Sequence, residues 1–124
     1  NEAEALRGFG AIAHQDRLRI IRMLVVAGPA GMSAGSISHE LGNASPSRVS
    51  FHLKELEHGG LVAGRRAGRS IIYSASFAAL SDLVAFLMRD CCNGHCIHCD
   101  RAIKLFAQAL AGLLDQSLIR EKTQ

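Results

Sequence analysis

Four cysteines cluster towards the end of the sequence, in the stretch CCNGHCIHC from Cys91 to Cys99. Disulfides among such close neighbours would close only a local loop, and in a reducing compartment such a cluster more often binds metal or senses redox state. Thiolates favour soft, thiophilic ions. With Cys96, or with His95 or His98, the loop also has the ligands for a tetrahedral zinc or cadmium site.

The same stretch supports a redox interpretation. Cys96-Ile-His-Cys99 has the C-x-x-C form of thiol oxidoreductases. Catalysis by that motif needs a thioredoxin-like βαβ context, which the sequence lacks, so we expect no enzyme. A regulatory disulfide or persulfide is the alternative use of these thiols.

A second stretch, SPSRVSFHLKELEHGG from Ser45 to Gly60, predicts a helix with a polar face directed at a charged partner. Ser45 suits the N-cap and Pro46 the first helical position, while Gly59-Gly60 ends the helix. One stripe of this helix, Val49, Leu53 and Leu56, has the spacing of a core-facing surface. The candidate DNA-binding residues lie on or near the other side: Ser45, Ser47, Arg48, Ser50, His52 and Lys54.

A β-hairpin is predicted directly after this helix. Leu61 to Arg66 and Arg69 to Ser74 have the pattern of two strands, joined by a tight turn at Ala67-Gly68. Arg65, Arg66 and Arg69 cluster at its tip. Three like charges at one tip favour contact with phosphate or with the minor groove of DNA.

Helical spacing of apolar residues predicts five further helices. They cover Glu2 to Ala13, a segment capped by Asp16 and ended by Gly28-Pro29, Ser33 to Leu41, Phe77 to Asp90, and Asp100 to about Arg120. A tight Gly42-Asn43 turn joins the third helix to the Ser45 segment, as in a helix-turn-helix. The apolar stripes of residues 1–13 and 100–120 exceed what a small core covers, so we expect a homodimer held by these two helices.

Composition narrows the class of protein. At 124 residues and 48% hydrophobic, the chain predicts one domain over residues 1–124. A net charge of +3 permits nucleic-acid binding without requiring it, and an aromatic content of 5% argues against a single-strand stacking platform. No apolar run is long enough for a bilayer and no signal-peptide pattern opens the chain, so we expect a cytoplasmic protein without a membrane partner.

These elements and three local motifs resemble the ArsR/SmtB winged-helix repressors of bacteria. AIAHQDRLRIIRML (Ala11 to Leu24) is similar to the family's A-L-A-[DH]-P-x-R-L-x-I-L-x-L-L, with Gln15 in place of proline. The segment from Ser45 to Val62 resembles S-x-S-x-V-S-x-H-L-K-x-L-x-x-A-G-L-V, with Gly59 in place of alanine, and RRAGRSIIYS follows where the family has its wing.

The resemblance covers about Leu6 to Cys99. It implies a mainly α-helical winged helix-turn-helix with a small β-hairpin. It also implies a homodimer that binds double-stranded operator DNA, represses its own metal-resistance operon and leaves the operator when a metal ion or metalloid binds.

Two sensor sites usual in this family are missing from the sequence. SAGSISHEL contains no C-V-C pair, and Phe77 to Arg89 offers only Asp82 among the usual ligands. The stretch from Cys91 instead resembles the C-C-x-G-x-P-x-x-C tail of arsenite-responsive members, with Cys96 at the proline position. The resemblance implies As(III) or Sb(III) as inducer, bound by the sulfurs of Cys91, Cys92 and Cys99. Cys96 adds a fourth available thiolate, so the pattern fits a site of three or of four sulfurs. A Zn(II)- or Cd(II)-responsive or thiol redox-sensing repressor on the same scaffold is the alternative.

Overall fold

The structure, a computed structural model, describes residues 1–89, 101, 104–105 and 107–109. By its internal contacts the chain divides into two compact units, Asn1–Leu87 and Met88–Gln124. In the second unit, Met88 ends the helix that begins at Phe77, Arg89 lies in a turn, and residues 101, 104–105 and 107–109 are helical, within the predicted helix 100–120. The predicted cysteine loop 91–99 lies outside the described residues. The assignment of residues 1–124 to one domain, with dimerisation helices at both ends, stays a prediction.

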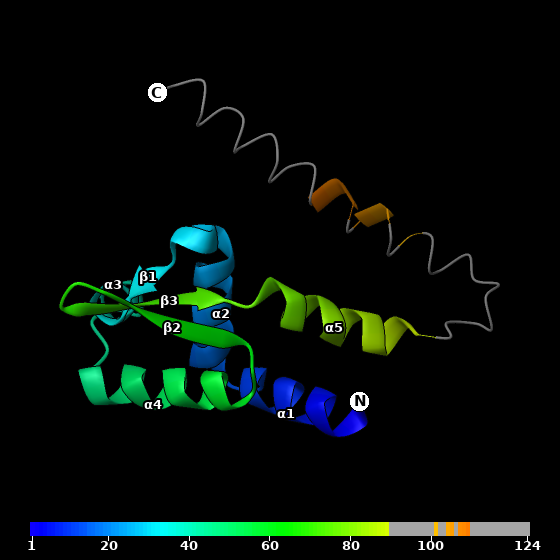
Figure 1. Cartoon of the computed structure of the whole chain (residues 1–124), viewed down its shortest axis with the longest axis horizontal. Coiled ribbons are helices and arrows are strands. Elements are labelled where there is room, and N and C mark those ends of the chain that lie inside the picture. Colours follow the sequence, from blue (N-terminus) through cyan, green and yellow to red (C-terminus); the bar gives the residue numbers. More distant parts are fainter. Residues whose placement is uncertain (90–100, 102–103, 106, 110–124) are drawn as a thin grey trace. The chain divides into compact units, whose positions relative to one another are not determined.

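The first unit combines helices with one small sheet (Figure 1). Its elements run in the order α1 (Glu2–Ile12), α2 (Gln15–Ala27), a 3₁₀ turn η1 (Gly28–Ala30), β1 (Met32–Ser33), α3 (Ala34–Glu40), α4 (Pro46–His58), β2 (Val62–Ala67), β3 (Ser70–Ala75) and α5 (Phe77–Met88). The three strands are antiparallel in the order β1-β3-β2. The predicted class, a winged helix-turn-helix that is mainly α with a small hairpin, is confirmed. None of the described helices is long and apolar enough to cross a membrane.

The hairpin differs from the prediction in two details. Both of its strands lie one residue later than expected, and the turn is formed by Gly68 and Arg69, with Gly68 at a φ of +64°. The loop after α2 also contains the short strand β1, where Met32 pairs with Tyr73. A strand of two residues shows no alternation of polar and apolar side chains, so periodicity could not find it.

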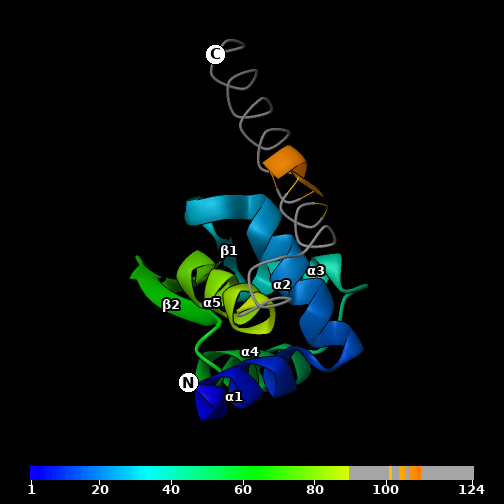
Figure 2. The same cartoon turned by 90° about the vertical axis from the view of Figure 1, so that its right-hand side faces the viewer.

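The core joins α2, α3 and α4 (Figure 2). Its fully buried large side chains come from these helices and from the start of the hairpin: Ile20, Leu24, Ile37, Val49, Leu53, Leu56 and Leu61. On α4, Val49, Leu53 and Leu56 recur at the predicted helical spacing. Burial of this stripe fixes which face of α4 is turned outward.

A close backbone approach seats α1 on the end of α4. A Cβ built at Gly59 would lie 2.6 Å from the Cβ of Ala11 and 3.3 Å from the carbonyl oxygen of Arg7. The φ of Gly59 is −76°, so its backbone conformation suits any residue. The lack of a side chain at Gly59 is therefore a packing requirement, and the left-handed glycine that follows the helix is Gly60, at a φ of +75°.

A polar network also ties the beginning of α2 to α4. The carboxylate of Asp16 is buried, and its Oδ2 accepts hydrogen bonds from Nη2 of Arg48 and from Nε of Arg48 at 2.9 Å. The same oxygen lies 3.4 Å from Nε2 of His52. Nη1 of Arg17 lies 3.5 Å from Nδ1 of His52, close enough to donate to it. We call His14, Asp16, Arg17, Arg48 and His52 the Asp16 network.

The two buried titratable groups of this network both have lowered pKa values. The hydrogen bonds from Arg48 lower the pKa of Asp16 and outweigh its desolvation, and the nearby positive charges act in the same direction. Burial lowers the pKa of His52 below its ordinary value of 6.5, and His14 and the two guanidiniums add to this against the opposing effect of Asp16. At neutral pH, Asp16 is therefore ionised and His52 neutral.

Replacement of Gly59 by alanine should destabilise the protein. The new methyl group meets Ala11 at less than van der Waals distance, and overpacking of this kind costs about 1–3 kcal/mol. Gly10→Ala is the matched control, since a Cβ at Gly10 meets nothing within 4 Å and alanine should stabilise α1 by about 0.5–1 kcal/mol. Urea denaturation of the two variants measures both effects, and equal stabilities would contradict the close packing.

Stability should fall as the pH drops below about 6.5, the pKa of histidine in an unfolded chain. In that range the unfolded state takes up a proton at His52, whereas the folded state, with its lower pKa, does not. His52→Gln keeps one donor and one acceptor but does not titrate. Urea denaturation at pH 7.5, 6.5 and 5.5 should therefore show a shallower loss of stability for His52→Gln than for the wild type. If stability falls equally with pH in the wild type and in His52→Gln, the proton is taken up at another group.

Candidate nucleic-acid interface

The outward face of α4 carries the predicted polar residues. Ser47, Ser50 and Lys54 are exposed, and the Arg48 side chain is 51% exposed. Ser45 caps the helix, since its Oγ accepts the N–H of Arg48 at 3.3 Å. The positions of these residues agree with the predicted polar face, and Ser45 lies at its N-terminal end, as the N-cap.

His52 does not lie on this face, and its predicted exposed position is wrong. Its ring is buried against Asp16, with 5% of the residue exposed. The physical reason is its spacing: His52 follows Val49 by three residues and precedes Leu56 by four, so it belongs to the buried stripe. The polar character of histidine hid that periodicity. His52 therefore helps to orient α4 through its buried contact with Asp16.

The three arginines of the wing differ in their contacts. Nη2 of Arg65 donates to the carbonyl oxygen of Ala30 at 3.0 Å, which ties the hairpin to η1. Arg66 is the next residue of the strand and so points to the opposite face, and Arg69 lies in the turn. Within the described part of the chain, Arg66 and Arg69 are exposed and form no ion pair. They are the wing residues most available to phosphate.

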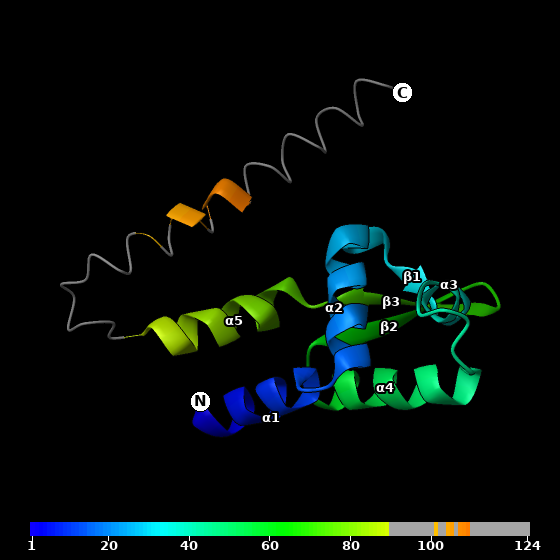
Figure 3. The same cartoon turned by 180° about the vertical axis from the view of Figure 1, so that it is seen from behind.

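The wing and the beginning of α4 lie at the same end of the unit (Figure 3). The tip of the β2–β3 hairpin projects beside α3, and the N-terminal end of α4 approaches the same region from below. The N-terminal end of α4 and the tip of the hairpin therefore lie at one end of the first unit. This is the arrangement in which a helix enters a groove of DNA while the wing contacts the backbone beside it.

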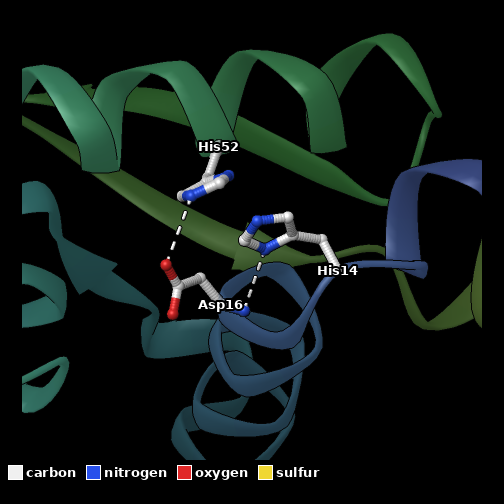
Figure 4. A group of neighbouring side chains, drawn as sticks. All are labelled: His14, Asp16 and His52. Atoms are coloured by element: carbon white, nitrogen blue, oxygen red, sulfur yellow. Dashed lines mark hydrogen bonds and ion pairs between the residues drawn. The ribbon is translucent and has the colours of Figure 1, made fainter.

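Part of the Asp16 network has the composition of a metal site. The ligand atoms of His14, Asp16 and His52 all lie within 4.8 Å of one another (Figure 4), and among the described residues this is the one such group. Two histidines and a carboxylate are suitable ligands for a divalent ion. The rings of His14 and His52 lie with their centroids 4.5 Å apart.

The lone pairs of this group already have protein partners. Nδ1 of His14 accepts the N–H of Asp16 at 3.1 Å and so caps α2, a role the sequence had assigned to Asp16 itself. Oδ2 of Asp16 accepts from Arg48, and a dication placed there would also face the guanidinium of Arg17. No buried side-chain polar atom of the described residues lacks a partner. The chemistry of the group therefore favours a structural network over a metal site.

The network also controls how Arg48 is presented. A guanidinium carries five N–H donors, and the bonds to Asp16 use two of them, from Nε and Nη2. The remaining donors belong to a side chain that is half exposed at the first turn of α4. Sequence reasoning missed this role of Asp16 because residues 16 and 48 are distant in the chain and no local pattern connects them. Arg48 is thus a pre-oriented donor on the edge of the polar face.

Known proteins are similar to a large part of this chain. A family model described as a helix-turn-helix domain matches residues 12–65. The nodulation protein NolR of Rhizobium meliloti is 36% identical over 69% of this chain and 68% of its own length. The transcriptional regulator YgaV of Escherichia coli is 34% identical over 66% of this chain and 80% of its own length.

Solved structures of ArsR-like regulators are also similar to this chain. An ArsR-like transcriptional regulator from Rhodococcus is 30% identical, with a TM-score of 0.64, over 87% of this chain and 93% of its own. A homodimeric winged helix-turn-helix domain of Mycobacterium bovis, described as a possible ArsR-family regulator, is 25% identical, with a TM-score of 0.58, over 77% of this chain and 84% of its own. The chain belongs to the ArsR family of winged helix-turn-helix transcriptional regulators, DNA-binding proteins that are generally not enzymes.

Proposed function

We propose that this protein is a homodimeric repressor that releases its operator when As(III) or Sb(III) binds the thiols between Cys91 and Cys99. The observation that carries the proposal is the position of these thiols in the chain. They follow directly on α5, and α5 itself begins just after β3 of the wing. A ligand that gathers Cys91, Cys92 and Cys99 therefore acts next to a helix connected to the DNA-binding hairpin.

Exposed apolar residues support the dimer. On α1, Leu6 is 66% exposed, and on α5, Val84 and Leu87 are 49% and 65% exposed. Side chains of this kind on two helices favour association with a second copy. The similar Mycobacterium bovis domain is homodimeric. Two copies related by a twofold axis would present two α4 helices to successive turns of DNA, so the operator should be an inverted repeat.

The path from the thiols to the DNA-binding face runs through α5. Leu83 of α5 is buried, and its side chain fills the space where a Cβ of Gly8 on α1 would stand, 2.9 Å from that position. At its other end, α5 follows the wing strand β3, where Ser76 N–H donates to the carbonyl oxygen of Leu61. Bending the end of α5 would shift α1, and with α1 the dimer contacts, relative to the wing.

The inducer is tested by fluorescence anisotropy on operator DNA. Arsenite or antimonite should weaken binding by about 5- to 150-fold, the range of typical allosteric coupling. Cys91→Ser, Cys92→Ser and Cys99→Ser should bind the operator with unchanged affinity and ignore the ligand, since each removes one of three required sulfurs. Cys96→Ser is the matched control and should still respond.

Parallel titrations with zinc, cadmium and peroxide separate the alternatives. Release by zinc or cadmium alone would replace the metalloid with a divalent ion, and release by peroxide alone would indicate a disulfide switch. An unresponsive Cys96→Ser together with a responsive Cys99→Ser would show that Cys96 is the third ligand.

The Asp16–Arg48 pair should affect sequence preference more than general affinity. Arg48→Ala should weaken binding to the operator by about 1–3 kcal/mol. Asp16→Asn keeps the shape but removes the charge that orients Arg48, so it should lower the ratio of specific to random binding. Arg69→Ala is the contrasting variant: it should weaken all sequences alike and reduce the salt slope by about one. Equal losses on operator and random DNA for Arg48→Ala would remove Arg48 from base readout.

A further inference from the structure

One large apolar side chain stands on the polar face of α4. Phe51 is 57% exposed, although α4 buries Val49, His52, Leu53 and Leu56 on its other side. Its neighbours on the helix surface are Ser47, four residues before it, and Lys54, three residues after it, and both are exposed. The ring of Phe51 therefore lies on the same face as the candidate DNA-binding residues, where burial against an apolar group of the DNA would be favourable.

The ring of Phe51 contacts the ring of His52. Its centroid lies 5.6 Å from that of His52, at an interplanar angle of 61°, an edge-type contact between neighbouring residues. His52 is itself buried in the Asp16 network. The Phe51 ring therefore makes an edge-type contact with a buried ring, while 57% of the residue stays exposed.

We infer that Phe51 reads thymine in the operator by packing against thymine 5-methyl groups in the major groove. The methyl group is the one apolar feature that a base pair presents in that groove, and phenylalanine is among the side chains that contact it. Ser47 and Lys54 beside the ring can donate to base edges or phosphates, so the surrounding surface is suited to DNA. The inference depends on α4 reading operator DNA, as in the proposed function, and is independent of the inducer.

The test uses the full-length protein and operators selected from a pool of random duplexes. The wild type should select sites with thymine at fixed positions opposite α4. Replacing one such thymine by 2′-deoxyuridine removes only the methyl group. It should weaken wild-type binding about fourfold, the effect of losing the burial of one methyl-sized group. For Phe51→Ala the same replacement should change the dissociation constant by less than about twofold, the scatter expected for groups that do not touch.

Two further variants control for folding and for general loss of apolar surface. Phe51→Leu keeps an apolar side chain and should retain part of the methyl effect. Val26→Ala removes a 69% exposed apolar side chain from α2 and should show the full wild-type effect. Thermal unfolding should give similar midpoints for all variants, because both substituted positions are exposed.

The outcomes separate this inference from the proposed function. A wild type that selects no sequence overturns both. A selected operator in which deoxyuridine weakens the wild type and Phe51→Ala equally, or weakens neither, overturns the role of Phe51 alone. In that case, release of the operator by arsenite still tests the proposed switch.

Discussion

The orientation of the polar face of α4 depends on the carboxylate of Asp16. This carboxylate lies in the first turn of α2, is buried, and faces Arg48 and His52 of α4 at the same oxygen. A buried charge is costly unless it is paired and hydrogen-bonded. The partners of Asp16, Arg48 and His52, both belong to α4. The orientation of α4 about its own axis is therefore set by two contributions: the burial of its apolar residues and the polar contacts with Asp16. The side chains of the opposite face are thereby directed outward together.

Much of this fold follows from local patterns. The cap at Ser45, Pro46 at the first helical position and the spacing of the apolar stripe were sufficient to locate α4. The hairpin was found to within one residue, because its turn glycine is a strong signal. The features that the sequence did not predict depend on contacts between residues that are distant in the chain. The spacing of His52 matches the buried stripe of α4, but histidine is polar and was therefore predicted on the exposed face. The polar partner that accommodates its buried ring is Asp16, which is distant in the chain.

The candidate site was predictable in part for the same reason. The exposure of Ser47 and Ser50 follows from helical periodicity, whereas the difference between Arg65 and its neighbour Arg66 does not. The hydrogen bond from Arg65 to Ala30 joins segments separated by more than thirty residues. It forms because β1 and β3 pair, which brings the turn after α2 against the hairpin. A run of arginines in the sequence thus contains one residue that stabilises the wing and others that are available to DNA.

The positions of the charged side chains matter more for DNA binding than the net charge does. Fourteen lysines and arginines against eleven acidic residues leave the chain only slightly basic. Phosphate contacts depend on cations placed at the interface, and Arg66 and Arg69 of the wing are exposed where such contacts are expected. In the proposed function, sequence specificity comes from the face of α4, where Arg48 is hydrogen-bonded to Asp16 and Ser47, Ser50 and Lys54 are exposed. In the proposed function, a small shift between two copies of α4 would be enough to release the operator. A coupling of about 1–3 kcal/mol between the proposed thiol site and α4, the range typical of allosteric pairs, would lower operator affinity by about 5- to 150-fold.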